Sequence, residues 1–236
     1  AAEVASPGTE AYVTKLEYDM DDVFNLTAYK TTPYGGSTTS TSFTTNAMNE
    51  YTAVGGVTHT YTDAGSLSDD GTKLYEYDAH QHLIAVRSKS TNAVIATYSY
   101  DALGLGRRIG KVVGSETTRY VHAGVQAVEE YDGTTSAANL RRLYVFGERI
   151  DQVVAMDAPD TSDIDQDQNT TEVLRLSFHT QLIGSVTQMT GPSGGVVESY
   201  EYDPYGKPTI KDQGGSTITA SAIGNSHLFT ARQLDE

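Results

Sequence analysis

Short apolar and aromatic runs along the chain are separated by polar turn signals, a pattern typical of β-strands joined by tight turns. Residues 58–61, 117–122, 143–146 and 196–202 are enriched in β-branched and aromatic side chains. Clusters such as Asp69-Asp70-Gly71 lie between such runs and predict turns. No stretch of ten or more residues has a convincing helical period. The pattern therefore predicts strand, turn and strand in repetition.

One short motif recurs: Tyr, any residue, Tyr, Asp, and then a turn. Alternate residues of a strand face the same side, so the two tyrosines of a copy should share one face of a sheet. The Asp should end the strand, because its side chain can cap the following turn. Each copy is thus predicted to be one hairpin. The residues assigned to the repeat are Tyr18, Asp19, Tyr75, Tyr77, Asp78, Tyr98, Tyr100, Asp101, Tyr131, Asp132, Tyr200, Tyr202 and Asp203.

Composition supports strands. The chain of 236 residues has 16 Tyr and only 5 Phe, and it has 22 Gly but no Trp or Cys. Tyrosine suits half-buried sheet faces, where the ring packs and the hydroxyl reaches water or a neighbour. The absence of cysteine excludes disulfides and thiol catalysis.

The formal net charge is −15. Such a surface repels phosphate backbones and anionic lipid headgroups, so we expect neither a nucleic-acid partner nor membrane docking. No apolar run approaches the roughly 18 residues needed to span a bilayer, and we expect no membrane insertion.

Three segments resemble motifs of the bacterial Rhs/YD-repeat family. Residues 177–186, SFHTQLIGSV, resemble the family's YYHTDHLGSV, although Gln181 and Leu182 replace Asp and His. Residues 196–206, VVESYEYDPYG, are similar to its VVERYxYDPYG strand. Residues 228–236, LFTARQLDE, resemble the beginning of its FTGRxLDExTGLYY core signature. The resemblance covers residues 46–236.

The resemblance implies an all-β fold of antiparallel hairpins in a curved or spiralling sheet that forms the wall of a shell or tube, with little or no helix. We expect edge strands or a loop over 1–45, hairpin repeats over 46–156, an acidic insertion loop over 157–171, and the start of the Rhs-associated core over 172–236. We also expect a processed product or an internal fragment, since the chain begins with Ala1.

The expected function is a non-enzymatic, extracellular or cell-surface scaffold. Its open sheet edges would pair with adjacent YD-repeat segments or with other copies to build a shell, tube or filament. Two alternatives stay open: a wall segment of a toxin-encapsulating Rhs cage, and a secreted adhesion or glycan-binding module. No catalytic set is predicted, because Ser185 lacks the Gly-x-Ser-x-Gly elbow that a triad with His179 would favour.

The acidic loop is the candidate for metal binding, and no other cofactor is expected. Alternating carboxylates resemble loops that wrap Ca²⁺ with oxygen ligands. The candidate ligands are Asp163, Asp165, Asp167, Asn169 and Glu172. Gln168 and Leu174 stand where an EF-hand-type loop would have Gly and Glu, so a solvated acidic loop is the alternative. His80 and His82 are expected in an exposed turn.

Overall fold

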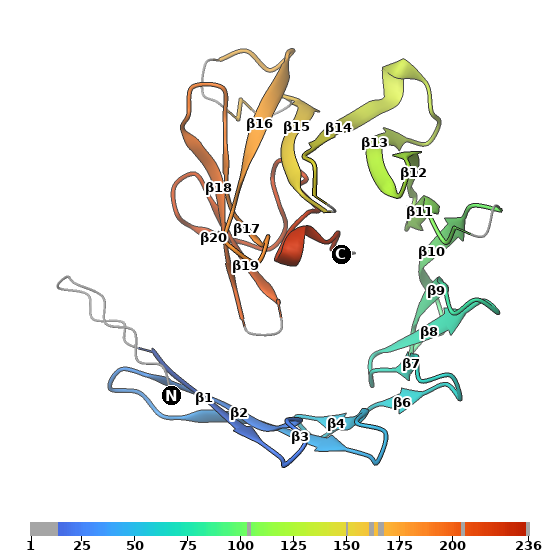
Figure 1. Cartoon of the computed structure of the whole chain (residues 1–236), viewed down its shortest axis with the longest axis vertical. Helices are drawn as coiled ribbons and strands as arrows, with labels where there is room; N and C mark the ends of the chain where they lie inside the picture. The colour runs from blue at the N-terminus through green and yellow to red at the C-terminus, as the bar shows by residue number, and fades with distance from the viewer. Residues whose placement is uncertain are drawn as a thin grey trace. The chain divides into compact units, whose positions relative to one another are not determined.

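The computed structural model describes residues 14–102, 105–149, 151–160, 163–164, 168–203 and 206–234. Within these ranges the chain is built of antiparallel β-strands, together with two single-turn 3-10 helices, η1 (Ala137–Asn139) and η2 (Phe229–Ala231) (Figure 1). The predicted all-β, antiparallel fold class is confirmed. No helix in the described ranges is long and apolar enough to cross a membrane.

The chain divides into two compact units, residues 1–98 and 99–236. In the first, strands β1–β5 form one sheet in sequence order, and β6–β10 also pair in sequence order. Its strands are β1 (Thr14–Met20), β2 (Leu26–Pro33), β3 (Thr39–Thr45), β4 (Tyr51–Val54), β5 (Val57–Thr58), β6 (Thr60–Tyr61), β7 (Leu67–Asp69), β8 (Lys73–Tyr77), β9 (Leu83–Ser88) and β10 (Val94–Tyr100), the last of which spans the boundary.

In the second unit, too, each strand lies beside its neighbour in the sequence. Its strands are β11 (Arg108–Val113), β12 (Glu116–Ala123), β13 (Gln126–Asp132), β14 (Leu140–Phe146), β15 (Val153–Pro159), β16 (Val173–Thr180), β17 (Val186–Thr190), β18 (Val196–Tyr202), β19 (Pro208–Asp212) and β20 (Thr217–Ile218). Residues 31–45 lie largely in β2 and β3, so strands rather than a loop are formed there. One boundary differs from expectation, because β15 extends into the expected insertion loop as far as Pro159.

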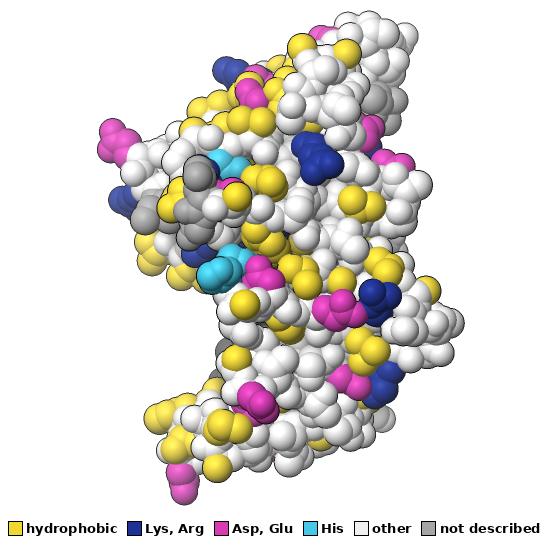
Figure 2. All heavy atoms as spheres, turned by 90° about the vertical axis from the view of Figure 1, so that its right-hand side faces the viewer, with side chains coloured by type: hydrophobic (Ala, Val, Ile, Leu, Met, Phe, Trp, Pro, Cys, Tyr) yellow, Lys and Arg dark blue, Asp and Glu magenta, His cyan; other side chains and the backbone are white. Residues whose placement is uncertain are grey.

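Tight turns set the register of these hairpins. In the β16–β17 turn, Gly184 N donates to Gln181 O at 2.8 Å. Gly184 has φ +86°, a left-handed conformation that glycine adopts without steric cost. Basic and acidic side chains pair between neighbouring strands, as Arg87 on β9 does with Glu76 on β8, and Figure 2 shows the two kinds close together on one face.

Tyrosine hydroxyls connect strands beyond the backbone ladder. Tyr61, Tyr77 and Tyr202 each stand at the end of a strand, and each donates to the carbonyl of the first residue of an earlier strand. The acceptors are Tyr51 O at 3.0 Å, Leu67 O at 2.8 Å and Val186 O at 2.7 Å, respectively. The ring fills the sheet face while the hydroxyl satisfies a backbone acceptor.

Replacing Tyr77 by phenylalanine should therefore lower the free energy of unfolding by about 1 kcal/mol, the typical net value of one hydrogen bond. Chemical denaturation checks this value. Tyr34→Phe is the control in the same unit, because the Tyr34 side chain is exposed. Equal losses in the two variants would contradict the role given to the Tyr77 hydroxyl.

The main hydrophobic core lies in the second unit. It joins β14–β19 to the segment after β20. Its buried residues are Tyr144, Val153, Met156, Ala158, Leu174, Leu176, Phe178, Val186, Met189, Val197, Tyr200, Ile210, Ile223, Leu228 and Ala231. This core places the segment of residues 219–234, named here the C-terminal strap, against the sheet.

Candidate functional site

Glu198 holds the beginning of the C-terminal strap. Its side chain is 1% exposed and accepts four hydrogen bonds. Two come from side-chain hydroxyls, Tyr200 at 2.6 Å and Ser221 at 2.8 Å. Two come from backbone N–H groups, Ala222 at 2.6 Å and Ile223 at 3.2 Å. A buried carboxylate is tolerated when its oxygens are saturated in this way.

Asn225 connects the strap to β18. Its amide nitrogen donates to Tyr200 OH and to His227 O, both at 3.1 Å. In return His227 N donates to Asn225 Oδ1 at 2.9 Å. Burial and the neighbouring Glu198 charge raise the pKa of Tyr200 well above its ordinary value, so the phenol stays protonated and can donate.

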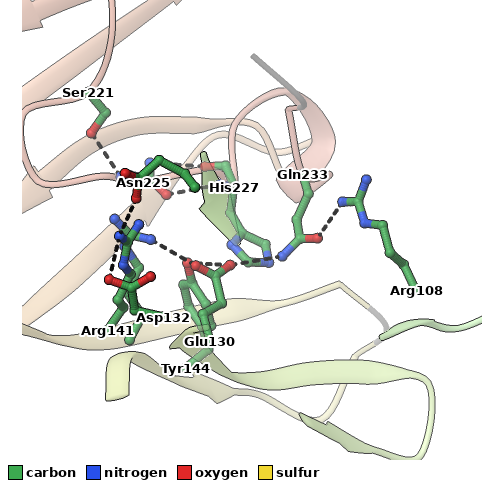
Figure 3. A network of polar contacts seen from close by, with 11 residues as sticks. Arg108, Glu130, Asp132, Arg141, Tyr144, Ser221, Asn225, His227 and Gln233 are labelled. Carbon is green, nitrogen blue, oxygen red and sulfur yellow. Dashed lines mark hydrogen bonds and ion pairs between the residues drawn. The ribbon is translucent and has the colours of Figure 1, made fainter. Parts of the chain in front are cut away.

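A second buried carboxylate, Glu130 on β13, anchors the far end of the strap (Figure 3). It accepts from Arg142 at 2.8 Å, from Tyr144 at 3.2 Å and from Gln233 Nε2 at 3.3 Å. Burial and Glu130 raise the pKa of Tyr144 well above its ordinary value. Arg108 on β11 reaches Gln233 Oε1 at 3.2 Å from the other side.

His227 lies in an aromatic setting, and in the sequence it stands between the strap residues that contact Glu198 and the one that contacts Glu130. Its ring centre is 4.5 Å from that of Tyr144, 5.9 Å from Phe146 and 6.4 Å from Phe178. The residue is 4% exposed, and its Nδ1 has no hydrogen-bond partner among the described residues. Burial, with a smaller effect of the Arg142 charge, lowers the pKa of His227 to about 4. The imidazole is therefore neutral near pH 7.

The Asp residues of the repeat hold their turns in several ways. Asp78 Oδ1 accepts from the N–H groups of His80 at 2.8 Å and His82 at 2.9 Å. Asp203 Oδ1 accepts from Lys207 N at 2.9 Å, and Asp101 accepts from the Arg107 guanidinium at 2.7 Å.

Two copies depart from the expected turn capping. Asp19 lies inside β1 and pairs with Lys30, while Asp21 caps the β1–β2 turn instead. Asp132 ends β13 but pairs with Arg141 at 2.9 Å. An Asp next to a strand end binds a cation when the facing strand supplies one.

The repeat tyrosines lie on strands, with different contacts. Tyr18 stacks on Tyr29 with ring centres 5.3 Å apart. Tyr75 OH donates to Asp70 at 2.6 Å and Tyr131 OH to Glu129 at 2.7 Å. Tyr98 and Tyr100 both lie on β10.

The expected calcium ligands are only partly described. Asp165 and Asp167 lie outside the described residues. Asp163 Oδ1 accepts from Gln168 N at 2.9 Å, and Asn169 Oδ1 from Thr171 N at 3.2 Å. The carbonyl of Glu172 accepts from Asp160 N at 2.8 Å. The described residues hold no group of three or more His, Asp or Glu side chains suited to a metal ion, and calcium binding stays a prediction.

The other candidates have local partners. The His80 and His82 rings are 5.9 Å apart, and His82 Nδ1 is 3.0 Å from Asp78. His179 Nε2 bonds Thr190 Oγ1 at 2.9 Å, and Ser185 Oγ accepts from Thr230 N at 3.0 Å.

Sequence reasoning missed Glu130, Glu198, Asn225 and His227. One signal was available: Glu198 precedes Tyr200 by two residues and must share its strand face. If the face that carries Tyr200 is buried, the Glu198 carboxylate is buried as well and must accept hydrogen bonds from other parts of the chain.

No protein-family model matches the chain. The tRNA nuclease WapA of Bacillus subtilis strain 168 is 28% identical over 225 residues, which are 94% of this chain and 9% of that protein. The tRNA3(Ser)-specific nuclease WapA of Bacillus spizizenii is 28% identical over 224 residues, again 94% of this chain and 9% of the relative. The chain thus spans less than a tenth of the length of these relatives.

Two solved structures show the same arrangement of strands. The crystal structure of TcdB2-TccC3-Cdc42 has a TM-score of 0.65 at 16% identity, over 95% of this chain and 11% of that one. The Photorhabdus luminescens Tc holotoxin pore has a TM-score of 0.63 at 15% identity, over the same shares. These likenesses show the fold. They support the Rhs-like hairpin sheet that the sequence motifs implied.

The names of the relatives correct one expectation. We expected a protein without enzymatic activity, but the curated relatives are named nucleases that act on tRNA. That expectation rested on the missing catalytic motif and on the scaffold that the family resemblance implied, and neither says anything about activities carried by a much longer relative. The comparisons also give no support to a filament-forming structural protein.

Proposed function

We propose that this chain is a stretch of β-hairpin wall in a secreted bacterial toxin that cleaves tRNA. The observation that carries the proposal is the alignment of 94% of the chain with a short part of tRNA nucleases. The fold likeness to a small part of TcdB2-TccC3, in structures that include a Tc holotoxin, supports the wall and the toxin context. The partners of the wall are adjacent hairpin segments of the same polypeptide, and tRNA is the substrate of the whole protein.

The structure of the second unit suits a wall. Consecutive hairpins extend the sheet by one strand at a time, and tyrosine hydroxyls tie neighbouring strands together. The buried carboxylates Glu130 and Glu198 fix the C-terminal strap on the sheet. The strap stiffens the part of the sheet that it covers. The unpaired backbone groups of an edge strand can bind a further strand, which lengthens the sheet.

A cleavage assay tests the activity. The full-length protein that contains this chain is incubated with total tRNA, and the products are separated on a denaturing gel. We expect cleavage of a defined subset of tRNAs. Intact tRNA in the presence of the folded protein would overturn the nuclease assignment.

Electron microscopy of the same preparation tests the wall. We expect hollow shells, and fewer of them in a Glu198→Ala variant than in the matched Glu201→Ala variant, in which an exposed Glu of the same strand is removed. Extended or dispersed particles without a shell would overturn the wall assignment and leave the cleavage result standing.

A further inference from the structure

Turns of one kind recur between the strands. In each, the N–H of the first residue donates to the carbonyl of the fifth, and the N–H of the fourth donates to the carbonyl of the first. The fourth residue has a positive φ, which glycine adopts without steric cost. Glycine therefore suits this place, and it stands there in the turns that contain Gly65, Gly184, Gly194, Gly206 and Gly215.

The turn between β1 and β2, residues 21–25, has a phenylalanine at this place. Asp21 N donates to Asn25 O at 2.9 Å, and Phe24 N donates to Asp21 O at 3.1 Å. Phe24 has φ +66°, a conformation in which a bulky residue is strained because its Cβ crowds the backbone. The residue is nevertheless 84% exposed.

The exposure of Phe24 sets it apart from the other four phenylalanines of the chain. Each of those packs against another aromatic ring, and the four are Phe43, Phe146, Phe178 and Phe229. The β1–β2 turn thus holds an aromatic ring in water at a position where glycine would remove the strain. Strain that persists in this way points to a function for the side chain.

Two more exposed apolar side chains belong to the same end of the sheet. Val23 precedes Phe24 in its turn, and Met48 lies in the turn between β3 and β4. The two turns lie side by side, because Asn25 Nδ2 donates to Asn49 Oδ1 at 2.9 Å. We name Val23, Phe24 and Met48 the apolar tip.

Carboxylates flank the apolar tip. Asp21 and Glu50 accept hydrogen bonds from neutral groups of their own turns, and Asp22 is exposed. The Asn25 amide holds the pKa of Asp21 below its usual value, so this carboxyl is ionised near pH 7. In the described part of the chain none of the three carboxylates has a cationic partner.

Cations are scarce in this part of the sequence. Between residues 16 and 72 the chain has Lys30 and no other Lys or Arg, and Lys30 pairs with Asp19. The negative charge around the tip is therefore left for a partner to balance. An anionic membrane surface would be repelled, and a second copy would bring the same carboxylates.

We propose that the apolar tip docks on another protein, at an apolar pocket rimmed by lysine or arginine side chains. Phe24 is the anchor that enters the pocket, since aromatic side chains dominate such contacts. Hairpins of the same wall pair through the backbone groups of strand edges, whereas these turns bond their backbone groups internally. This docking role goes beyond the wall and does not depend on the nuclease activity.

Peptide selection tests the chemistry of the partner. A library of random short peptides displayed on phage is selected on the immobilised 236-residue chain and depleted on a Phe24→Gly variant. The variant keeps every charge, so depletion removes peptides that bind by general attraction alone. We expect the surviving peptides to carry apolar residues flanked by Lys or Arg. Synthesised survivors should bind Phe24→Gly at least about tenfold more weakly than the unchanged chain.

Two further variants and a stability measurement serve as controls. Tyr34→Ser removes an exposed aromatic residue just beyond the other end of β2, and it should change affinity by less than about twofold. Asp22→Asn removes one flanking charge and should weaken binding by about threefold. Phe24→Gly should not lower the melting temperature, because glycine adopts the positive φ of this position freely.

Four results would overturn the docking site. The first is that no peptide survives depletion, or that the survivors lack basic residues. The second is a lowered melting temperature in Phe24→Gly, which would assign the ring to folding. The third is a dimer in sedimentation velocity that is lost in Phe24→Gly, and the fourth is Phe24-dependent flotation with phosphatidylcholine vesicles. These last two would assign the tip to a second copy and to a lipid surface.

Discussion

A Glu198→Ala variant is expected to lose roughly 4 kcal/mol of unfolding free energy, the largest effect of any single change considered. The substitution leaves four donors without their acceptor: the hydroxyls of Tyr200 and Ser221, and the N–H groups of Ala222 and Ile223. A buried donor without a partner costs about 1–3 kcal/mol, and water entering the gap recovers part of that loss. Urea denaturation followed by circular dichroism measures the change.

The matched control is Glu201→Ala on the same strand. Glu201 has a side chain that is 66% exposed and pairs with Lys211 on the neighbouring strand. Exposed pairs contribute about 0–1 kcal/mol, so the loss should be about 0.5 kcal/mol or less. Hydrogen exchange adds a local readout, with faster exchange over residues 219–234 only in Glu198→Ala. Similar losses in both variants would show that the carboxylate does not hold the strap.

The strand content could be predicted because its signals are local. A Tyr-x-Tyr-Asp copy such as residues 75–78 has its strand period, its turn and its capping Asp within a few neighbouring residues, and β8 with its turn forms there. The exceptions have local causes as well. Asp19 binds Lys30, which stands across the hairpin, and so the turn is capped by Asp21 two residues later.

The C-terminal strap could not be predicted because its contacts are distant in sequence. Ala222 and Ile223 reach Glu198 across more than twenty residues, and Gln233 reaches Glu130 across 103. The strap follows β20 and has no strand period of its own, and the Glu198 carboxylate accepts two of its backbone N–H groups. The spacing of Glu198 and Tyr200, which places both side chains on one strand face, was the one sequence signal for this contact. It becomes informative only once that face is known to be buried.

Net charge describes the average of the chain and not each part of it. A net charge of −15 describes long-range repulsion, yet Arg108, Lys111, Arg141 and Arg142 all line one cavity between β11–β14 and the strap. Net charge therefore predicts how the chain meets large polyanions better than it predicts binding at a small site. At such a site direct hydrogen bonds and close charges dominate.

His227 should make the stability of the second unit depend on pH. Its pKa is about 4 in the folded chain and 6.5 is the ordinary value. Between these values the unfolded chain binds more protons than the folded chain, so stability falls as pH falls. The loss begins near pH 6.5 and is complete below about pH 4, where a shift of this size corresponds to about 3 kcal/mol.

A His227→Phe variant isolates this contribution. Phenylalanine keeps a ring among Tyr144, Phe146 and Phe178 but cannot be protonated. The charged groups around the ring, Arg142 on β14 and its ion-pair partner Glu130 on β13, are present in both proteins, so their contribution cancels in the difference. Urea denaturation at several pH values from 7 to 4 should show the wild-type chain losing up to about 3 kcal/mol more than the variant. Parallel profiles would contradict the lowered pKa of His227, because they would show that the folded chain protonates the imidazole as readily as the unfolded chain does.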